Sequence, residues 1–519
     1  MPVASADRRT SQRIVAVLVS SLFAAAGIVA FSAGSRASAE TLPPPVNGVW
    51  SVVGHGYGHG HGMSQYGARG AARHGLTAAQ IIAFYYPGTT TTVLAAGSAI
   101  RVKLTDDGAD TVVGASPGLT LSGPGGSQKL ITAGRSQWRL KPSGAGFAVD
   151  YLPTGTSVWK RFMTTPSTSA DFSRTPNEIR LFRNGGTSTV YRGKVGAVRT
   201  GASQITVNRL LLDDYLRGVV PREMPSLWEP AAVQAQAIAA RSYARYAVEH
   251  NATGRYDICD TTSCQVYGGK TAIIGGKVIG EELGSDTAVK ATAGLVARYQ
   301  SATIFAQFSA SNGGWSTAGS QPYLVAKADP YEVYSGDPYL NWQRQVPMSA
   351  VASHYGFTSV QTIQINQRDG HGEWGGRVLL ATVIGKSGST TKSVSTTGST
   401  LAFAMGLPHS WFTSAGNPFG HVDSVTTAPG TVTSAGWAID PNTSGPIMVQ
   451  MYIDRSANAV TWANRPRTDV GAAYPGYGPN HGFALTMQTT TGLHTVCLFA
   501  INTGPGTSKQ ISCHTVSVP

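Results

Sequence analysis

The sequence predicts an α+β fold that is mostly β. Short runs rich in β-branched and aromatic residues recur along the chain and are broken by glycine and proline, whereas helical periodicity is rare. One stretch of about twenty residues lacks both Gly and Pro and predicts a single long helix. With 519 residues, the chain is long enough for two to four domains with their own cores.

The N-terminus has the pattern of a secretory signal peptide. Three arginines within residues 8–13 precede an apolar stretch over residues 14–30, and Ala-Ser-Ala at 37–39 forms a small-residue cleavage site. We expect cleavage after Ala39 and a secreted protein. The alternative is an uncleaved membrane anchor, but Ser, Gly and Ala dilute the apolar run.

The amino-acid composition and net charge limit the classes of partner that the protein can bind. Charged residues make up only 13% of the chain, and the net charge is +13. A basic protein outside the cell meets anionic wall polymers and membrane surfaces, and nucleic acid is the other candidate anion. The positive charges are scattered, with no Lys/Arg run and no nucleic-acid motif, so we expect no nucleic-acid partner.

Residues 40–90 open the mature chain with GHGYGHGHGMSQYGARGAARHG, Gly54–Gly75. The histidines at 55, 59 and 61 suggest a metal site. However, alternating Gly and His has no rigid element to set ligand geometry, and the segment has no acid or Cys, so we expect no metal. A helix is predicted from Thr77 to about Tyr85.

Three further regions follow. Residues 95–200 are expected to form a β-domain packed into, or inserted in, the core formed by 40–420; the alternative is an independent sandwich. Residues 205–420 form the next region and contain the long helix. From 422 to 519 the chain is rich in Thr and Gly and predicts an accessory β-sandwich, with Val449–Ile453 as one strand. The strands predicted in the second region are Ala99–Leu104, Gln137–Leu140 and Glu178–Phe182.

Residues 218–246, GVVPREMPSLWEPAAVQAQAIAARSYARY, are the most informative stretch. Glu223 lies among apolar residues, and the long helix follows it. Ser226–Glu229 has the pattern of a capping box, and Pro230 suits a first helical turn. We therefore predict an acid on an apolar-walled loop held by a rigid helix. The alternative is a loop Glu that caps the helix or forms a salt bridge.

This stretch, together with DICDTTSCQVYGG at Asp257–Gly269, resembles the core signature of the SpoIID/LytB family. The resemblance implies a secreted bacterial protein that acts on peptidoglycan. The enzymatic members of this family are lytic transglycosylases, and the family's catalytic Glu falls on Glu223. Ser309–Thr317 resembles the family's Ser/Gly-rich segment.

The Gly54–Gly67 segment resembles the family motif GHGxGMSQxGA, and His59, Ser64 and Gln65 fall on its fixed positions. In the family pattern this motif closes the core, whereas here it opens the chain. A circular permutation explains the order if the natural ends of the core lie close together. We therefore expect the segment to pack beside Glu223.

Glycosidic cleavage by a lytic transglycosylase works with one carboxylic acid. Burial would raise the pKa of Glu223, whereas the helix start expected at 227 would favour its carboxylate. Arg241 and Gln234 lie on one helix face and could hold the Glu223 loop, contact sugar or face solvent. Five other acids could supply a second carboxylate, although junction and capping roles are expected for the first three. They are Asp213, Asp214, Glu229, Asp257 and Asp260.

The four cysteines form two local pairs. Cys497 and Cys513 are expected to form a disulfide in an exported protein. For Cys259 and Cys264 a disulfide is preferred, but zinc with His250 stays open, because two thiols make only half of a zinc site.

The function predicted is that of a peptidoglycan lytic transglycosylase that needs no cofactor. Its substrate would be glycan strands stripped of stem peptides, and a monomer is expected. The alternative is a non-catalytic wall-binding enhancer of an amidase or another autolysin. The predicted substrate-binding residues are Gln234, Arg241, Gln265, Tyr267, Ser309, Ser311, His59, Ser64 and Gln65.

Overall fold

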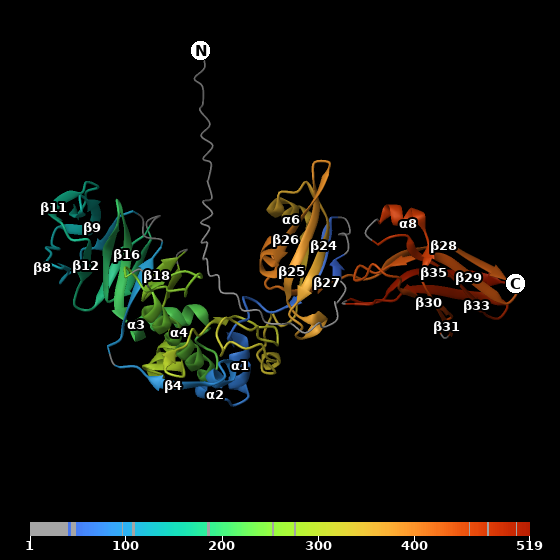
Figure 1. Ribbon diagram of the computed structural model, residues 1–519, viewed down its shortest axis with the longest axis horizontal. Coiled ribbons are helices and arrows are strands. Elements are labelled where there is room, and N and C mark those ends of the chain that lie inside the picture. The colour runs from blue at the N-terminus through green and yellow to red at the C-terminus, as the bar shows by residue number, and fades with distance from the viewer. Residues whose placement is uncertain are drawn as a thin grey trace, which may run out of the picture. The chain divides into compact units, whose positions relative to one another are not determined.

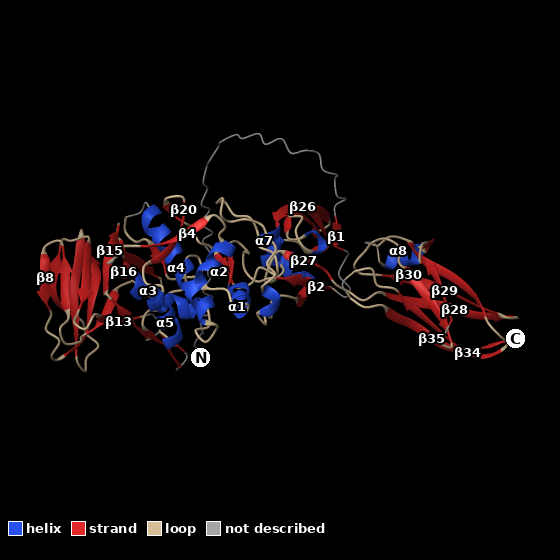
Figure 2. Cartoon of the chain, turned by 90° about the horizontal axis from the view of Figure 1, so that it is seen from below, coloured by secondary structure: helices blue, strands red, loops and turns tan. Residues whose placement is uncertain are grey.

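The computed structural model describes residues 40–42, 48–95, 97–105, 109–183, 187–251, 254–274, 277–455, 457–474, 477–504 and 506–519. The fold is α+β and mostly β, as predicted (Figure 2). The predicted signal peptide, 1–39, lies outside the described residues. Among the described helices, none combines the length and apolarity that a membrane crossing requires.

Two large antiparallel sheets come mainly from residues 99–211 (Figure 1). One has the order β11 (Lys160–Thr165), β10 (Gly146–Pro153), β9 (Arg135–Ser143), β6 (Thr111–Gly114), β13 (Glu178–Phe182), β14 (Ser188–Arg192), β18 (Thr271–Ile274), β19 (Lys277–Gly280). The other has the order β17 (Ile258–Cys259), β5 (Ala99–Leu104), β16 (Ser203–Leu211), β15 (Lys194–Thr200), β12 (Ser169–Ser173), β7 (Thr120–Gly123), β8 (Gly126–Lys129), in which β17 pairs parallel with β5. The three strands predicted here are confirmed; one of them extends to the bounds of β9.

Five helices pack against one another: α1 (Gln65–Arg73), α2 (Ala78–Tyr85), α3 (Leu212–Glu223), α4 (Pro230–His250) and α5 (Leu283–Ala291). Of these, α3 and α4 contact strands of the second large sheet. The long helix is confirmed as α4. The predicted helix that follows Thr77 is confirmed as α2, where Thr77 and Gln80 form a capping box. A small sheet of β4 (Thr89–Val93), β20 (Leu295–Tyr299) and β21 (Ala302–Thr303) borders them.

The capping box predicted at the start of α4 is wrong. The N-cap is Glu229, and it makes no side-chain capping bond. Ser226 instead donates its hydroxyl hydrogen to Glu282, just before α5. The Ser226 hydroxyl therefore binds a residue that is distant in sequence, whereas the sequence pattern predicted that it would cap α4.

One hydrophobic cluster joins these parts. Its buried members run from Met63 to Leu324 and come from α1 to α5 and from both large sheets. Residues 95–200 thus share a core with the helices that carry the signature, which favours the packed β-domain over an independent sandwich.

A second cluster forms within residues 40–420, where the sequence suggested a single core. Its buried members are Leu42, Trp50, Val52 and residues between Trp342 and Phe412. This cluster lies between two sheets and two helices. One sheet has the order β1 (Glu40–Leu42), β24 (Ser359–Arg368), β25 (Val378–Ser387), β26 (Thr390–Thr397), and the other has the order β23 (Trp342–Pro347), β2 (Val49–His55), β27 (Trp411–Ser414). The helices are α6 (Met348–Tyr355) and α7 (Gly398–Ala404).

The C-terminal region is a sandwich of two antiparallel four-stranded sheets, as predicted (Figure 2). The first sheet has the order β28 (Phe419–Ala428), β29 (Thr431–Ile439), β33 (Asn480–Gln488), β32 (Arg465–Pro466). The second has the order β31 (Ala457–Trp462), β30 (Met448–Ile453), β34 (Gly492–Ala500), β35 (Lys509–Val518), and α8 spans Thr468–Ala473. The main hydrophobic cluster between the sheets contains only residues of this region.

Candidate functional site

The glycine-rich segment docks onto the Ser/Gly-rich segment, far away in sequence. β3 (Met63–Ser64) pairs parallel with β22 (Phe308–Ser309), and isolated bridges join Tyr57 to Ser311 and His61 to Thr317. This packing brings the beginning of α1 close to the end of α3. The expectation that the segment packs beside Glu223 is confirmed.

Two glycines show why the segment needs so many. A Cβ on Gly62 would lie 2.1 Å from the Gln307 carbonyl oxygen, and the φ of Gly62 is +66°. A Cβ on Gly70 would lie 1.9 Å from the carbonyl oxygen of Tyr331. The missing side chains therefore permit backbone contacts that any other residue would block.

A buried carboxylate, Glu332, anchors the segment. One of its oxygens accepts hydrogen bonds from the Ser64 hydroxyl (2.7 Å) and the Asn312 amide (3.0 Å), and the other accepts from the Gly314 amide (2.8 Å). Burial and the charge of Asp329 raise the pKa of Glu332 to about 8. Glu332 thus holds the glycine-rich segment and the Ser/Gly-rich segment together through buried hydrogen bonds.

Glu223 is the last residue of α3. Pro225 disfavours a helical conformation at the preceding residue, and Met224 is extended, with φ −138° and ψ 135°. The helix ends there and leaves the Glu223 side chain half-buried. The predicted acid therefore lies at the end of a helix, not within a loop.

The surroundings of Glu223 favour the protonated acid. Its Oε1 accepts a hydrogen bond from the Val266 amide at 3.0 Å. Burial raises the pKa of Glu223, opposed in part by this amide and by the side chain of Gln65. The C-terminal end of α3 adds negative potential, which also disfavours the carboxylate. Within the described part of the chain, no cation pairs with Glu223.

Two amides lie next to the acid. Gln65, the first residue of α1, contacts Glu223 and donates to Gln236 Oε1 at 3.4 Å. The Nε2 of Gln236 is buried and has no hydrogen-bond partner among the described residues. Sequence reasoning singled out Gln234 instead, which is half-buried on α4. Only the packing of α1 on α4 distinguishes the two glutamines.

The neighbouring carboxylates are each paired elsewhere. Asp213 and Asp214 lie in the first turn of α3, which confirms the predicted junction, and both have arginine partners. Glu229 pairs with Arg69 at 3.2 Å and Arg73 at 2.7 Å. Asp257 pairs with Arg101, and Asp260 accepts from the Thr105 hydroxyl and lies 3.7 Å from Arg183. Glu223 is therefore the unpaired acid of this set.

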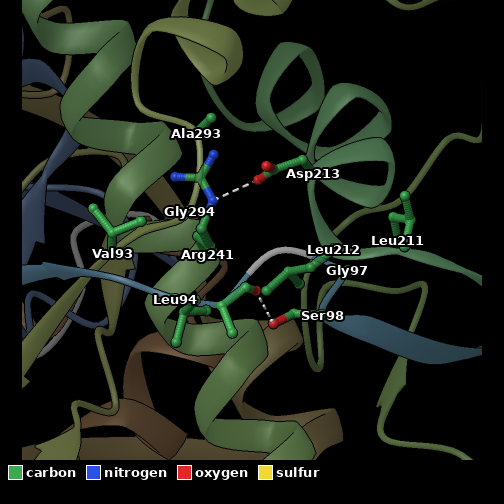
Figure 3. A pocket seen from close by; sticks show the side chains of 11 residues that line it. Val93, Leu94, Gly97, Ser98, Leu211, Leu212, Asp213, Arg241, Ala293 and Gly294 are labelled. Atoms are coloured by element: carbon green, nitrogen blue, oxygen red, sulfur yellow. Dashed lines mark hydrogen bonds and ion pairs between the residues drawn. The ribbon is translucent and has the colours of Figure 1, made fainter.

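Arg241 braces the helices through buried hydrogen bonds. Its side chain is fully buried, and its Nε donates to Asp213 Oδ1 at 2.7 Å (Figure 3). The guanidinium also donates to the carbonyls of Leu295 (3.1 Å) and Val289 (3.3 Å). It lies beside a cavity of about 220 Å³ at the opposite end of α3 from Glu223. The alternative that Arg241 contacts sugar does not fit this burial.

Gln265 and Tyr267 are buried as well, although they were expected to line a cleft. Gln265 accepts from the Tyr215 hydroxyl at 3.2 Å and donates to the Ala240 carbonyl at 3.3 Å. The Tyr267 hydroxyl donates to Asn208 at 2.8 Å, and its ring packs where a Cβ on Gly218 would lie. Together they hold the loop in which Val266, the residue between them, donates its backbone N–H to Glu223.

The other predicted binding residues differ in exposure. Ser64 and Ser311 are buried, and Ser311 donates to Asp337 at 2.6 Å. Ser309 is almost buried and accepts from the Gly60 amide at 3.2 Å. The side chain of His59 is exposed. Of the predicted binding residues in this segment and in Ser309–Thr317, His59 is therefore the exposed one.

A row of aromatic rings includes Tyr66, the residue after Gln65, and sequence reasoning missed it. Trp228 packs on Tyr66 at 4.9 Å between ring centroids, Tyr66 lies 6.3 Å from Tyr339, and Tyr339 stacks on Tyr57 at 4.6 Å. The first three rings are half-buried, and Tyr57 is 46% exposed. Its four members come from three separate segments, since Tyr57 and Tyr66 both belong to the glycine-rich segment, so no local pattern predicts the row.

Both cysteine pairs form disulfides, Cys259 to Cys264 and Cys497 to Cys513. The first closes the loop that leads to Val266. His250 contacts the Tyr246 carbonyl and stacks on that ring. Among the described residues, no group of three or more His, Cys, Asp or Glu side chains is arranged to hold a metal ion.

Comparison with known proteins identifies the region around Glu223. Residues 200–299 match the model of the family described as SpoIID, stage II sporulation protein. The chain carries a SpoIID domain. The domain spans α3, α4 and the loop of Val266, so it includes Glu223 and its amide partner but not the glycine-rich segment.

Two relatives share part of this sequence. An uncharacterized protein of Brachyspira hyodysenteriae is 34% identical over 137 residues, and the amidase enhancer of Bacillus subtilis is 37% identical over 118 residues. The matches cover 26% and 22% of this chain and only 35% and 15% of the two relatives. No solved structure matches.

Proposed function

We propose that the protein is an exported peptidoglycan lytic transglycosylase in which Glu223 is both the acid and the base. The observation that carries the proposal is the state of Glu223, which is half-buried, bound by neutral donors and raised in pKa, while the acids around it are paired with arginines or hydroxyls. Surroundings that favour the protonated carboxyl are what a general acid requires.

The reaction needs only this one carboxyl. The Glu223 acid donates its proton to the oxygen that links C1 of N-acetylmuramic acid to the next sugar, and the C1–O bond breaks. The muramic acid C6 hydroxyl then bonds to C1 and returns its proton to Glu223. The products are a 1,6-anhydro end and a new free 4-hydroxyl, no water is consumed, and the route calls for no cofactor.

The aromatic row supports a polymeric substrate. Rings present flat apolar surfaces against which sugar rings can pack, and the row lets several sugars bind beside the acid. The buried amide of Gln65 can orient the Glu223 carboxyl, and Gln236 accepts a hydrogen bond from Gln65 and so helps to hold it in place. Peptide-free glycan fits this arrangement best, because stem peptides would have to pass the same rings.

A second candidate is a non-catalytic enhancer of a wall amidase. One observation favours it, since a relative 37% identical over the same domain is named an amidase enhancer. In that case Glu223 would bind glycan without cleaving it, and a wall amidase would be the partner.

Product analysis separates the two candidates. Purified protein, without any amidase, is incubated with peptide-free glycan strands, and the products are examined by mass spectrometry. We expect fragments with 1,6-anhydro-muramyl ends, which weigh one water less than hydrolysed fragments. Reducing ends would indicate a hydrolase, and intact strands would favour the enhancer.

The raised pKa of Glu223 sets the expected pH profile. The active form is the protonated acid, so kcat/KM should be constant at low pH and fall about tenfold per pH unit above the pKa of Glu223. Because burial raises that pKa, the decline should begin above the usual Glu value of about 4.3. Gln65 donates to the carboxylate and lowers the pKa, so Gln65→Leu should move the decline to higher pH. A decline that moved to lower pH would contradict the assignment.

A further inference from the structure

The C-terminal sandwich has one outer face that is unusually apolar. Cross-strand pairing places Met448 opposite Trp462 and Gln450 opposite Val460, with Val449 and Met451 turned inward. Met448, Val460, Trp462 and Leu493 all point outward from β30, β31 and β34, with exposures of 38%, 57%, 52% and 76%. They are the exposed large apolar side chains of the described sandwich residues, and they share one face.

This face also holds a cavity of about 560 Å³, within the size range of small-ligand sites of about 300–1,000 Å³. Tyr452 and Phe499 line it, with ring centroids 5.5 Å apart. The Cys497–Cys513 disulfide lies on the cavity wall and links β34 to β35 there. The cavity therefore lies mainly on a cross-linked sheet.

The polar lining alternates with the rings. Gln450 lies directly across from Phe499, and Phe499 lies across from Gln510, so an amide flanks this ring on each side. Thr495 and Ser508 add hydroxyls. Rings with amides and hydroxyls around them suit a sugar, which has an apolar face and a rim of hydroxyl and acetamido groups. Lipid would leave these amides without partners.

Charge narrows the class of sugar. Arg455 is the charged side chain among the described residues that line the cavity. Its neighbour Asp454 is already bound to His494 at 2.6 Å and to the Thr495 amide at 2.8 Å. An arginine beside a sugar-sized cavity, in a chain of net charge +13, suits a carboxylate-bearing glycan.

We propose that the outer face of the β31-β30-β34-β35 sheet binds peptide-free glycan strands, with Tyr452 and Phe499 packing on sugar rings and Arg455 binding the lactyl carboxylate of muramic acid. This second glycan site does not depend on cleavage at Glu223. Two sites on one chain would raise retention on an insoluble polymer well beyond the affinity of either alone.

The test uses the full chain with Glu223→Gln, so that cleavage plays no part, and measures co-sedimentation with insoluble peptide-free wall glycan. Adding Tyr452→Ala and Phe499→Ala should weaken retention at least tenfold, because the second site is lost. The matched control is Thr486→Ala on the outer face of the other sheet, where Thr486 pairs with Thr433, and it should leave retention unchanged. Unchanged retention in the double variant would overturn the proposal.

Arg455→Gln tests the carboxylate with a smaller change. Retention on wall glycan should fall several-fold, whereas retention on chitin, a β-1,4-linked polymer of N-acetylglucosamine that lacks the lactyl carboxylate, should not change. An equal effect on both polymers, or none on either, would contradict recognition of muramic acid. If the double variant lost self-association or binding to anionic vesicles but kept glycan retention, the face would serve that other partner and the proposal would fail.

Discussion

Glu223→Gln should abolish the release of anhydro-muropeptides while leaving wall pelleting intact. Glutamine keeps the size and the neutral charge of the protonated acid but cannot supply a proton, and loss of a general acid typically removes about 10²–10⁴-fold of rate. Binding should survive, because the aromatic row and the outer face of the sandwich are unchanged. The measurement is the initial rate of anhydro-end formation by mass spectrometry, alongside co-sedimentation with wall.

Glu229→Gln is the matched control. It makes the same chemical change six residues away, in a carboxylate that pairs with Arg69 and Arg73 at a partly exposed position. Such pairs contribute about 0–1 kcal/mol, so the variant should fold and retain activity within a few-fold of the unchanged chain. Near-normal turnover of Glu223→Gln would show that another group supplies the proton.

Deleting residues 50–90 should leave no folded core around Glu223. The deletion removes Met63, Ile81, Ile82, Tyr85 and Tyr86, all buried in the cluster shared by both large sheets and α3 to α5. At about 1.5–3 kcal/mol for each large side chain, the loss is about 8–15 kcal/mol, which matches the whole stability of a typical domain. Circular dichroism should show no cooperative melting of the core around Glu223, and the release of anhydro ends should be absent.

Removing residues 419–519 is the contrasting deletion. The main cluster of the sandwich contains only its own residues, so the rest of the chain should still melt cooperatively. Gly70→Ala tests with a single added Cβ whether the core depends on the packing of this segment. The new Cβ would clash with the Tyr331 carbonyl, so the variant should be less stable despite the better helix propensity of alanine. Gly125→Ala, which has open space around it, should leave stability nearly unchanged. A chain without 50–90 that melted and cleaved normally would show the segment to be dispensable.

Much of the local structure could be predicted from the sequence. A helix without Gly or Pro, strands with alternating patterns and a capped helix at Thr77 all depend on neighbours a few residues apart, and α4, β5, β13 and α2 are there. The capping box predicted at Ser226–Glu229 is wrong because a distant carboxylate, Glu282, binds the Ser226 hydroxyl that the local pattern assigned to the helix.

The sequence by itself determined the position of Glu223, the acid of the proposed reaction, because one acid followed by a long helix is a local pattern. Only the tertiary structure decided what surrounds that acid. Gln65 comes to Glu223 from about 160 residues away through the packing of α1, whereas Arg241, Gln265 and Tyr267 turn inward because buried polar groups take the partners that folding brings to them. The aromatic row and the outer face of the sandwich likewise arise from strands and helices whose neighbours are set by long-range contacts, which no local pattern specifies.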